Sequence, residues 1–337
     1  MDRKVLQRCS LCLVTTGANF FVSSRGMRVF RFLMRINLVI AVINSITSAV
    51  LDDWMKGVSL SAITNTAFSH SRGIVFTILI IRSSDIEGLL CETVAYASAR
   101  DLKNLLRFMR LTTTFAFIIN GLKAMEGLFV YSKRGFWWVV WRANQDTSIC
   151  WITMTCVVYA ISLRILFICF MQKTRLLRIK LLKSTDSARC VREFTIEIRE
   201  LHKRFEKLYN LMPLLWFVAA VIEGPRIIMI LSRSTLIEFL LFLSWPVNCI
   251  ICPIAVCFLV SSLKSHLNDT LTEIYYALCN SRDISKDNTE ILFNLESVRS
   301  LQFTGLSFFA MDRSFVLSLI GTIFTVSALL DQYMKRV

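Results

Sequence analysis

Several charged side chains lie inside stretches of the sequence that are otherwise apolar, and five of them form one cluster. Lys123 and Glu126 are three residues apart, so on a helix the two side chains lie on the same face. The same spacing separates Glu223 from Arg226, and Glu238 stands alone. Charges in apolar surroundings usually face protein or a water-filled cavity. With aromatic rings at similar depth, they predict a pocket for a small organic ligand. Its candidate binding residues are Lys123, Glu126, Trp151, Tyr159, Glu223, Arg226, Glu238 and Trp245.

The same charges allow a second interpretation, in which both pairs are structural ion pairs between helices and bind no ligand. Gly224 and Pro225 lie between the members of the second pair, and this dipeptide predicts a bend that opens space in the helix. Tryptophan rings stack on sugars and attract alkaloid-like cations. A pocket in this region would therefore suit ligands of those two classes.

Motifs for catalysis and metal binding are absent from the sequence. Two cysteine pairs have CxxC spacing, but neither has a second Cys or His pair to complete a metal site: Cys9 with Cys12, and Cys249 with Cys252. The three His residues lie far apart, and no zinc-protease, serine-hydrolase or phosphate-loop motif occurs. We therefore expect no enzyme activity, no cofactor and no bound metal.

The elements that carry the candidate residues are predicted to be membrane-spanning helices. Of the 337 residues, 55% are hydrophobic and 19% are charged, and the mean hydropathy is +0.56. Soluble domains carry about 25% charged residues, so this composition excludes a soluble fold. A spanning helix needs about 20 mostly apolar residues. Seven stretches qualify, namely 32–51, 57–81, 111–131, 148–171, 208–231, 236–262 and one within 303–333.

The basic residues lie mainly on one side of the predicted membrane. Of the 39 Lys and Arg residues, 27 lie in the N-terminal segment and in every second connection after it, and 7 lie on the other side. Cytoplasmic loops retain the positive excess. The sequence therefore predicts a cytoplasmic N-terminus and an extracellular C-terminus. Because the net charge of +15 follows this pattern, it does not indicate a nucleic-acid partner.

This orientation divides the all-α chain into four parts. Residues 1–31 are a cytoplasmic segment, 32–262 a six-helix bundle with the candidate pocket, 263–302 a cytoplasmic loop or anchor, and 303–337 the seventh helix. Within the bundle, 172–207 is predicted to continue as helix beyond the bilayer. Its basic residues either touch anionic membrane lipid or lie on a solvated face. Helical spacing of apolar residues predicts a stripe formed by Phe194, Ile198, Leu201, Phe205 and Leu208.

The seventh segment carries the most specific pattern in the chain. It reads FTGLSFFAMD at 303–312 and TVSALLDQY at 325–333. This resembles the seventh-helix signature of insect gustatory receptors, in which Phe-Thr, a later Phe and an Asp precede Thr-Tyr, five hydrophobic residues and Gln-Phe. Thr325 and Gln332 fall at the family spacing. Val326 replaces the Tyr, Tyr333 replaces the Phe and Asp331 replaces a hydrophobic residue, so the chain resembles a divergent member.

The resemblance implies a ligand-gated, non-selective cation channel in the plasma membrane of a sensory neuron. It implies a homotetramer or a heterotetramer with other gustatory receptor subunits, opened by a small-molecule tastant. The four seventh helices would line the pore, with Thr325 on this helix and with Gln332 and Tyr333 at the constriction. Four copies of Asp331 would form an acidic ring that concentrates cations, unless Asp331 pairs with Lys335. Sugars, bitter compounds, carbon dioxide and internal nutrients are all compatible with the family.

Two other receptor classes compete with this interpretation. A channel subunit of the insect odorant receptor type shares the orientation, but the spacing of Thr325 and Gln332 favours the gustatory branch. A seven-helix G-protein-coupled receptor requires the opposite orientation, and its Asp-Arg-Tyr and Asn-Pro-x-x-Tyr motifs are absent. The glycosylation sequon at Asn268 is cytosolic in the predicted topology and extracellular in the inverted one.

Overall fold

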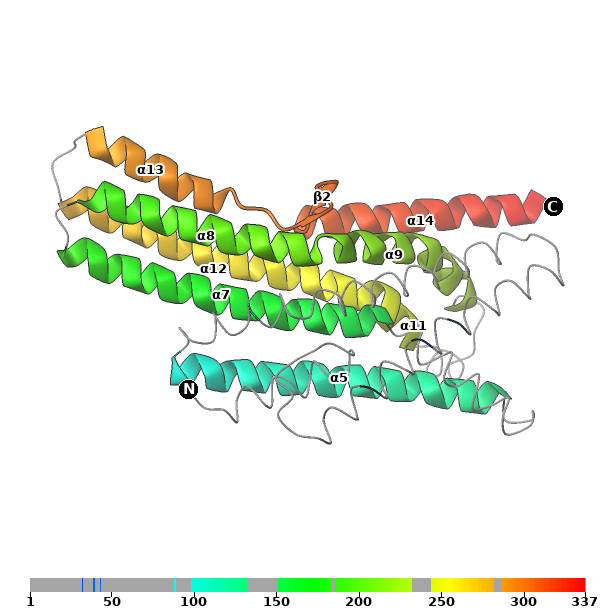
Figure 1. Cartoon of the computed structure of the whole chain (residues 1–337). Coiled ribbons are helices and arrows are strands. Elements are labelled where there is room, and N and C mark those ends of the chain that lie inside the picture. The colour runs from blue at the N-terminus through cyan, green and yellow to red at the C-terminus, as the bar shows by residue number, and fades with distance from the viewer. Residues whose placement is uncertain are drawn as a thin grey trace.

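The computed structural model describes residues 98–131, 151–183, 186–231, 244–281 and 286–336, together with residues 32, 39, 43 and 88. Apart from one short hairpin, the elements are helices. Figure 1 shows the long helices side by side, with α14 extending beyond them toward the C-terminus. The elements are α5 (Ala99–Tyr131), α7 (Trp151–Lys183), α8 (Ser187–Tyr209), α9 (Leu211–Leu231), α11 (Ser244–Pro246), η1 (Val247–Ile251), α12 (Cys252–Ser281), α13 (Lys286–Arg299), β1 (Thr304–Gly305), β2 (Phe309–Ala310) and α14 (Arg313–Arg336).

Two of the described helical stretches are long and apolar enough to cross a membrane, Ile152–Leu181 and Val247–Ala277. A third span forms if α8 and the first part of α9, which meet at a 44° bend, are taken together. The length and apolar composition of these stretches are typical of a helical membrane protein. Apart from residues 32, 39 and 43, the N-terminal segment and the first two predicted spans lie outside the described residues. The count of seven spans and the orientation therefore stay predictions.

The helix α7 lies at the centre of the described structure. Most of its side chains between Ile152 and Phe170 are buried. Three helices, α5, α8 and α12, pack around it. Because α7 is apolar on nearly all sides, it needs neighbours on nearly all sides. The helix α7 therefore contacts both the groove and the segment before α14, which are described below.

The helix α8 is amphipathic and begins at a polar cap. The Asp186 carboxylate accepts a hydrogen bond from the Arg189 amide at 2.9 Å, which satisfies one of the amides left unpaired at a helix start. The buried face includes the whole predicted stripe from Phe194 to Leu208, so that prediction is confirmed. The chain bends at Asn210 and continues as α9. The predicted extension 172–207 thus consists of the end of α7 and most of α8.

A π-helical turn, η1, interrupts the helical segment that runs from α11 into α12. Its Asn248 is buried, and the side-chain oxygen accepts hydrogen bonds from the Thr153 amide at 2.8 Å and the Thr153 hydroxyl at 2.7 Å. Thr153 lies in the first turn of α7, where amides have no partner within the helix. Asn248 therefore completes the start of α7. Turns of this type frequently occur at functional sites.

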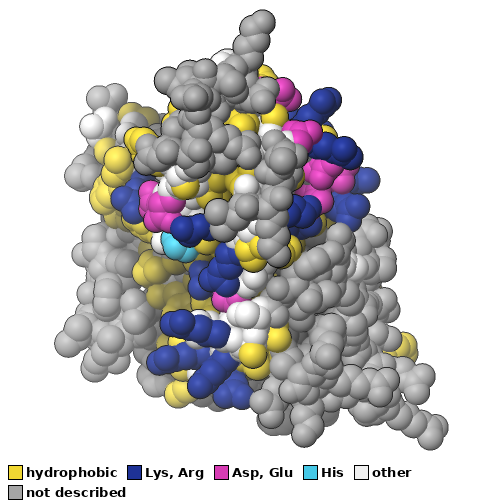
Figure 2. Space-filling model, turned by 90° about the vertical axis from the view of Figure 1, so that its left-hand side faces the viewer, with side chains coloured by type: hydrophobic (Ala, Val, Ile, Leu, Met, Phe, Trp, Pro, Cys, Tyr) yellow, Lys and Arg dark blue, Asp and Glu magenta, His cyan; other side chains and the backbone are white. Residues whose placement is uncertain are grey.

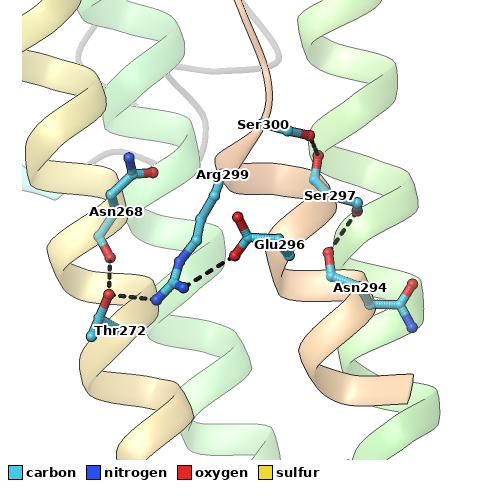
Figure 3. A network of polar contacts seen from close by, with 7 residues as sticks. All are labelled: Asn268, Thr272, Asn294, Glu296, Ser297, Arg299 and Ser300. Carbon is cyan, nitrogen blue, oxygen red and sulfur yellow. Dashed lines mark hydrogen bonds and ion pairs between the residues drawn. The ribbon is translucent and has the colours of Figure 1, made fainter. Parts of the chain in front are cut away.

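A polar network joins α12 to α13 (Figure 3). Arg299 donates a hydrogen bond to the Thr272 hydroxyl and pairs with Glu296 at 3.2 Å. Thr272 in turn donates to the backbone carbonyl of Asn268 at 2.8 Å. The opposite side of α13 packs on α8. The segment 263–302, predicted as a loop or anchor, is therefore helical over most of its length.

The segment predicted to begin the seventh helix forms a β-hairpin. Strands β1 and β2 pair antiparallel. Between them Leu306 and Ser307 have φ angles of 49° and 64°, the left-handed conformation that a tight turn requires. A Cβ atom at Gly305 would lie 2.4 Å from the ring of Phe309, so a larger residue there would have to displace that ring. Asp312 then caps α14, and the backbone hydrogen bond that its carboxylate accepts lowers its pKa.

Candidate functional site

A groove of about 610 Å³ opens between α5, α7 and α12. Small side chains on the groove-facing side of α7 leave the space, and aromatic rings from α5 and α12 form the walls. The groove lies beside η1, because Thr153 lines the groove and also donates hydrogen bonds to Asn248 of η1. Its lining is largely apolar and includes the rings of Phe108, Phe115 and Phe258 and the hydroxyl groups of Thr112, Thr153 and Ser262.

Two of the hydroxyl groups in the groove are oriented by the protein. The Thr112 hydroxyl donates to the Phe108 carbonyl at 3.0 Å, and the Thr153 hydroxyl donates to Asn248. A hydroxyl oxygen has two acceptor lone pairs, so each can still accept a hydrogen bond from a ligand. The groove is thus suited to a small apolar molecule that carries one or two hydrogen-bond donors.

The helices that carry most of the predicted ligand-binding residues converge near the start of α7. The short α11, which contains Trp245, contacts both α5 and α9. Glu238 lies outside the described residues. For five other predicted residues the structure describes the helix but not the side chain: Lys123, Glu126, Trp151, Arg226 and Trp245. The described lining of the groove contains none of the eight predicted residues. The groove is therefore a separate candidate that the sequence did not reveal, because its residues are ordinary apolar ones.

Tyr159 is the predicted ligand residue whose surroundings the structure describes most fully. Its ring is 1% exposed and packs edge-on against Phe205, Tyr209 and Trp216, with centroid distances of 5.2, 5.5 and 5.3 Å. Its hydroxyl donates to the sulfur of Met311 at 3.4 Å. Tyr159 therefore connects α7 to α8, to α9 and to the segment just before α14.

The predicted charged residue Glu223 is buried in α9, with 3% of its surface exposed. The next residue, Gly224, lies directly against α14, because a Cβ atom there would be 2.7 Å from Cγ2 of Ile323. Glycine thus lets the two helices approach closely. Pro225 follows inside α9, and Figure 1 shows the last part of this helix turning away from α14.

One face of α14 packs against α9, and the opposite face is exposed in the single chain. Ser318, Thr325 and Gln332 are all exposed and are seven residues apart, so they lie on one side of the helix. Leu317 and Phe324 flank them with 72% and 62% of their surface exposed. The exposed face of α14 thus combines a polar stripe with apolar borders.

The predicted gate residues all lie on α14, and two of their side chains are described. The Thr325 hydroxyl donates to the Gly321 carbonyl at 2.8 Å, and Gln332 is exposed. The side chains of Asp331 and Tyr333 are outside the described set, so the acidic ring and the aromatic constriction stay predictions. Sequence reasoning missed Ser318, although its position seven residues before Thr325 is a signal that could have found it.

The hairpin before α14 is held by α8 and by the bend that follows it. The Glu206 carboxylate accepts hydrogen bonds from the Thr304 amide at 3.0 Å and from the Thr304 hydroxyl at 2.8 Å. The Leu306 amide donates to the Asn210 carbonyl at 2.9 Å. Burial raises the pKa of Glu206, and the hydrogen bonds from Thr304 oppose this rise. Glu206 was not identified from the sequence, because in the chain it is one of several acids on a charged helix.

Three aromatic rings complete the connection to α14. Phe309 of β2 stacks on Phe315 of α14 with a centroid distance of 4.1 Å and an angle of 6° between the rings. Phe217 of α9 contacts both rings at 5.6 Å. The hairpin is therefore in direct contact with the first turn of α14.

The described part of the chain has no group of three or more His, Cys, Asp or Glu side chains placed to hold a metal ion. Cys156 and Cys252, which line the groove, are free thiols.

No family model and no curated protein sequence matches the chain. Among solved structures, the chain is similar to the insect olfactory receptor OR5 from Machilis hrabei, with a TM-score of 0.69, 13% sequence identity and 97% of each chain covered. The same receptor in complex with eugenol gives a TM-score of 0.68, 13% identity and 98% coverage of each chain. The chain therefore has the fold of an insect olfactory receptor.

Proposed function

We propose that the chain is a subunit of a ligand-gated, non-selective cation channel of the insect chemoreceptor class. The observation that carries the proposal is the exposed face of α14. A polar stripe on a helix in a membrane has to face water or another subunit. Copies of α14 around a common axis would enclose a water-filled path lined by Ser318, Thr325 and Gln332.

The ligand is proposed to be a small molecule that binds within the helical bundle. The similar receptor from Machilis hrabei has been solved in complex with eugenol. In this chain the groove between α5, α7 and α12 has the volume and apolar lining for a ligand of that general size. The cluster of predicted charged and aromatic residues near α11 is the second candidate position.

Within the chemoreceptor class we assign the chain to the gustatory branch, and its ligand is then a tastant. The assignment rests on the FTGLSFFAMD segment and on the spacing of Thr325 and Gln332. It includes assembly as a tetramer, alone or with other gustatory subunits, in the plasma membrane of a sensory neuron. A subunit of the odorant receptor type is the alternative that the similarity in fold favours.

The pore assignment is tested by cysteine substitution and a charged thiol reagent. The chain is expressed alone and with candidate partner subunits, and currents are recorded across a panel of tastants and odorants. Ser318→Cys and Gln332→Cys should become sensitive to block by the reagent. Leu319→Cys is the matched control, because Leu319 is 1% exposed and faces α9. Equal block at Leu319, or no block at either polar position, would contradict the assignment.

A topology measurement separates the channel from a G-protein-coupled receptor. Short epitope tags are placed at both ends, and intact cells are stained before permeabilisation. The channel proposal requires an accessible C-terminal tag and a protected N-terminal tag. The opposite pattern would favour the inverted receptor, and two tags on one side would exclude both.

A further inference from the structure

The start of α5 carries a stripe of basic side chains to which the proposed function gives no role. Arg100, Lys103, Arg107 and Arg110 follow one another at spacings of three, four and three residues, so they share one helical face, and all four are exposed. None of them forms an ion pair with the rest of the described chain. Figure 2 looks onto the end of the molecule where α7 ends, and shows Lys and Arg side chains gathered on its lower part, at the level of α5.

Within the described residues, the acidic residue beside this stripe is Asp101, and its carboxylate is engaged elsewhere. Asp101 accepts hydrogen bonds from the Ser98 hydroxyl and from the Gln172 amide, each at 2.6 Å. It also lies 3.8 Å from the guanidinium group of Arg175 on α7. The Asp101 charge is therefore directed toward α7, and no acidic side chain among the described residues pairs with the four cations of the stripe.

The face that carries the stripe continues along α5 as exposed apolar side chains. Leu111, Ile118 and Met125 are seven residues apart, and 63%, 55% and 64% of their surfaces are exposed. They lie on the same side of the helix as Arg100 and Arg107. Leu111 is also the first residue of the predicted third span. A face that is apolar within the span and basic directly before it has the arrangement of a lipid-facing surface that ends among head groups.

We propose that this basic stripe of α5 binds anionic phospholipid of the adjoining membrane leaflet. The stripe runs from Arg100 to Arg110, which is about 15 Å of helix. The head-group layer on one side of a bilayer is only about 5–7 Å thick. A phospholipid whose additional phosphates project from the surface, such as a phosphorylated inositol lipid, is therefore the ligand that can meet all four cations. The proposal goes beyond channel function and depends only on a cytosolic start of α5.

A second exposed row of cations, on α8, supplies the matched control. Arg192, Arg199 and Lys203 also share one helical face and are exposed. They differ from the stripe in two respects. Acidic residues of α8 lie among them, including Glu193 and Glu200, and the row lies in the extension predicted to leave the membrane. Removing these three charges changes the net charge as much as removing three from α5.

The test uses the full chain, purified in detergent and titrated with a fluorescent phosphatidylinositol bisphosphate. The stripe variant carries Lys103→Gln, Arg107→Gln and Arg110→Gln together. A cation near an anionic lipid surface contributes about fivefold in affinity, so this variant should bind about 100-fold more weakly. The α8 variant with Arg192→Gln, Arg199→Gln and Lys203→Gln should keep its affinity within about fivefold. Elution volume and melting temperature confirm that both variants fold.

Three results would overturn the proposal. The first is an equal loss in the two variants, which would mean that net charge alone attracts the lipid. The second is equally tight binding of soluble inositol hexakisphosphate and of the lipid, because a free polyphosphate would then be the ligand. The third is a changed oligomeric state in the stripe variant, because the stripe would then contact another copy of the chain.

Discussion

The attachment of the hairpin to α8 can be tested by substituting Glu206. In Glu206→Ala, the Thr304 amide and hydroxyl both lose their acceptor. A hydrogen bond to a charged group contributes about 1.5–3 kcal/mol. The two bonds together are offset by the burial of the carboxylate, which the raised pKa of Glu206 reflects. We take the net contribution as about 2 kcal/mol, which changes the equilibrium between attached and detached hairpin about 30-fold.

Hydrogen exchange of the peptide that contains 303–312 measures this equilibrium directly. The amides of Thr304 and Leu306 are protected only while the hairpin is attached to α8 and to the bend. Their exchange should therefore be about 30-fold faster in Glu206→Ala. Glu206→Gln retains an acceptor oxygen and lacks the cost of burying a charge, so its exchange should rise by about fivefold or less.

Glu200→Ala is the control for this experiment, because Glu200 is an exposed acid on the same helix. Exchange in the hairpin should be unchanged in that variant. If Glu206→Ala and Glu200→Ala give the same exchange rates, the carboxylate does not hold the hairpin and the coupling argument is wrong. A uniform rise in exchange across α8 and α13 would instead indicate general unfolding.

Three further predictions concern packing, a buried hydrogen bond and pH. Gly224→Ala places a methyl group 2.7 Å from Ile323 and should cost about 1–3 kcal/mol, with part of the loss recovered by adding Ile323→Ala, as measured by thermal unfolding. Asn248→Leu leaves the buried amide and hydroxyl of Thr153 without their shared acceptor, so melting should show a loss of about 2–4 kcal/mol, with a weaker ligand response. Burial lowers the pKa of His202 from 6.5 to about 4, so the unfolded chain binds a proton between these pH values that the folded chain does not. Stability should therefore fall as the pH falls, by about 2 kcal/mol between pH 7 and pH 5, and His202→Gln should remove this part of the dependence.

Each of these predictions has an outcome that contradicts it. Additive losses in the double variant would show that Gly224 and Ile323 are not in contact. An unchanged melting temperature in Asn248→Leu would show that Thr153 finds another acceptor. The pH comparison is made between the parent chain and His202→Gln, because protonation of Glu206 acts in the opposite direction in both proteins. Identical pH profiles would mean that His202 is not buried neutral.

The regular elements could be predicted because their pattern is local. The stripe from Phe194 to Leu208 repeats at helical spacing, and the structure buries that stripe. The hairpin at 303–312 could not be predicted in this way. Its residues are mostly apolar, and that composition predicts the beginning of a spanning helix. Its shape depends on contacts made far along the chain, with Glu206 and Asn210. Those partners become visible only when α8 and the hairpin are placed together.

Of the two candidate sites, the stripe of α14 could be predicted from a local pattern and the groove could not. The polar stripe of α14 follows from the positions of Thr325 and Gln332, which the sequence singled out, and Ser318 extends it by the same interval. The groove arises differently. Its walls are common apolar residues on three helices, and its volume depends on how closely α5 approaches α7 and α12. Residue types alone carry no information about that distance.

Tyr159 lies between the groove and the segment that precedes α14. Val157 and Ala160 line the groove on one side of α7, while Tyr159 between them contacts Met311 on the other. The groove and the hairpin are therefore separated by a single helix, about 10 Å wide. Because packed interiors do not compress, a ligand that displaces α7 must either move the hairpin or break the contact at Tyr159. Since Phe309 stacks on Phe315, the first of these outcomes changes the position of α14 itself.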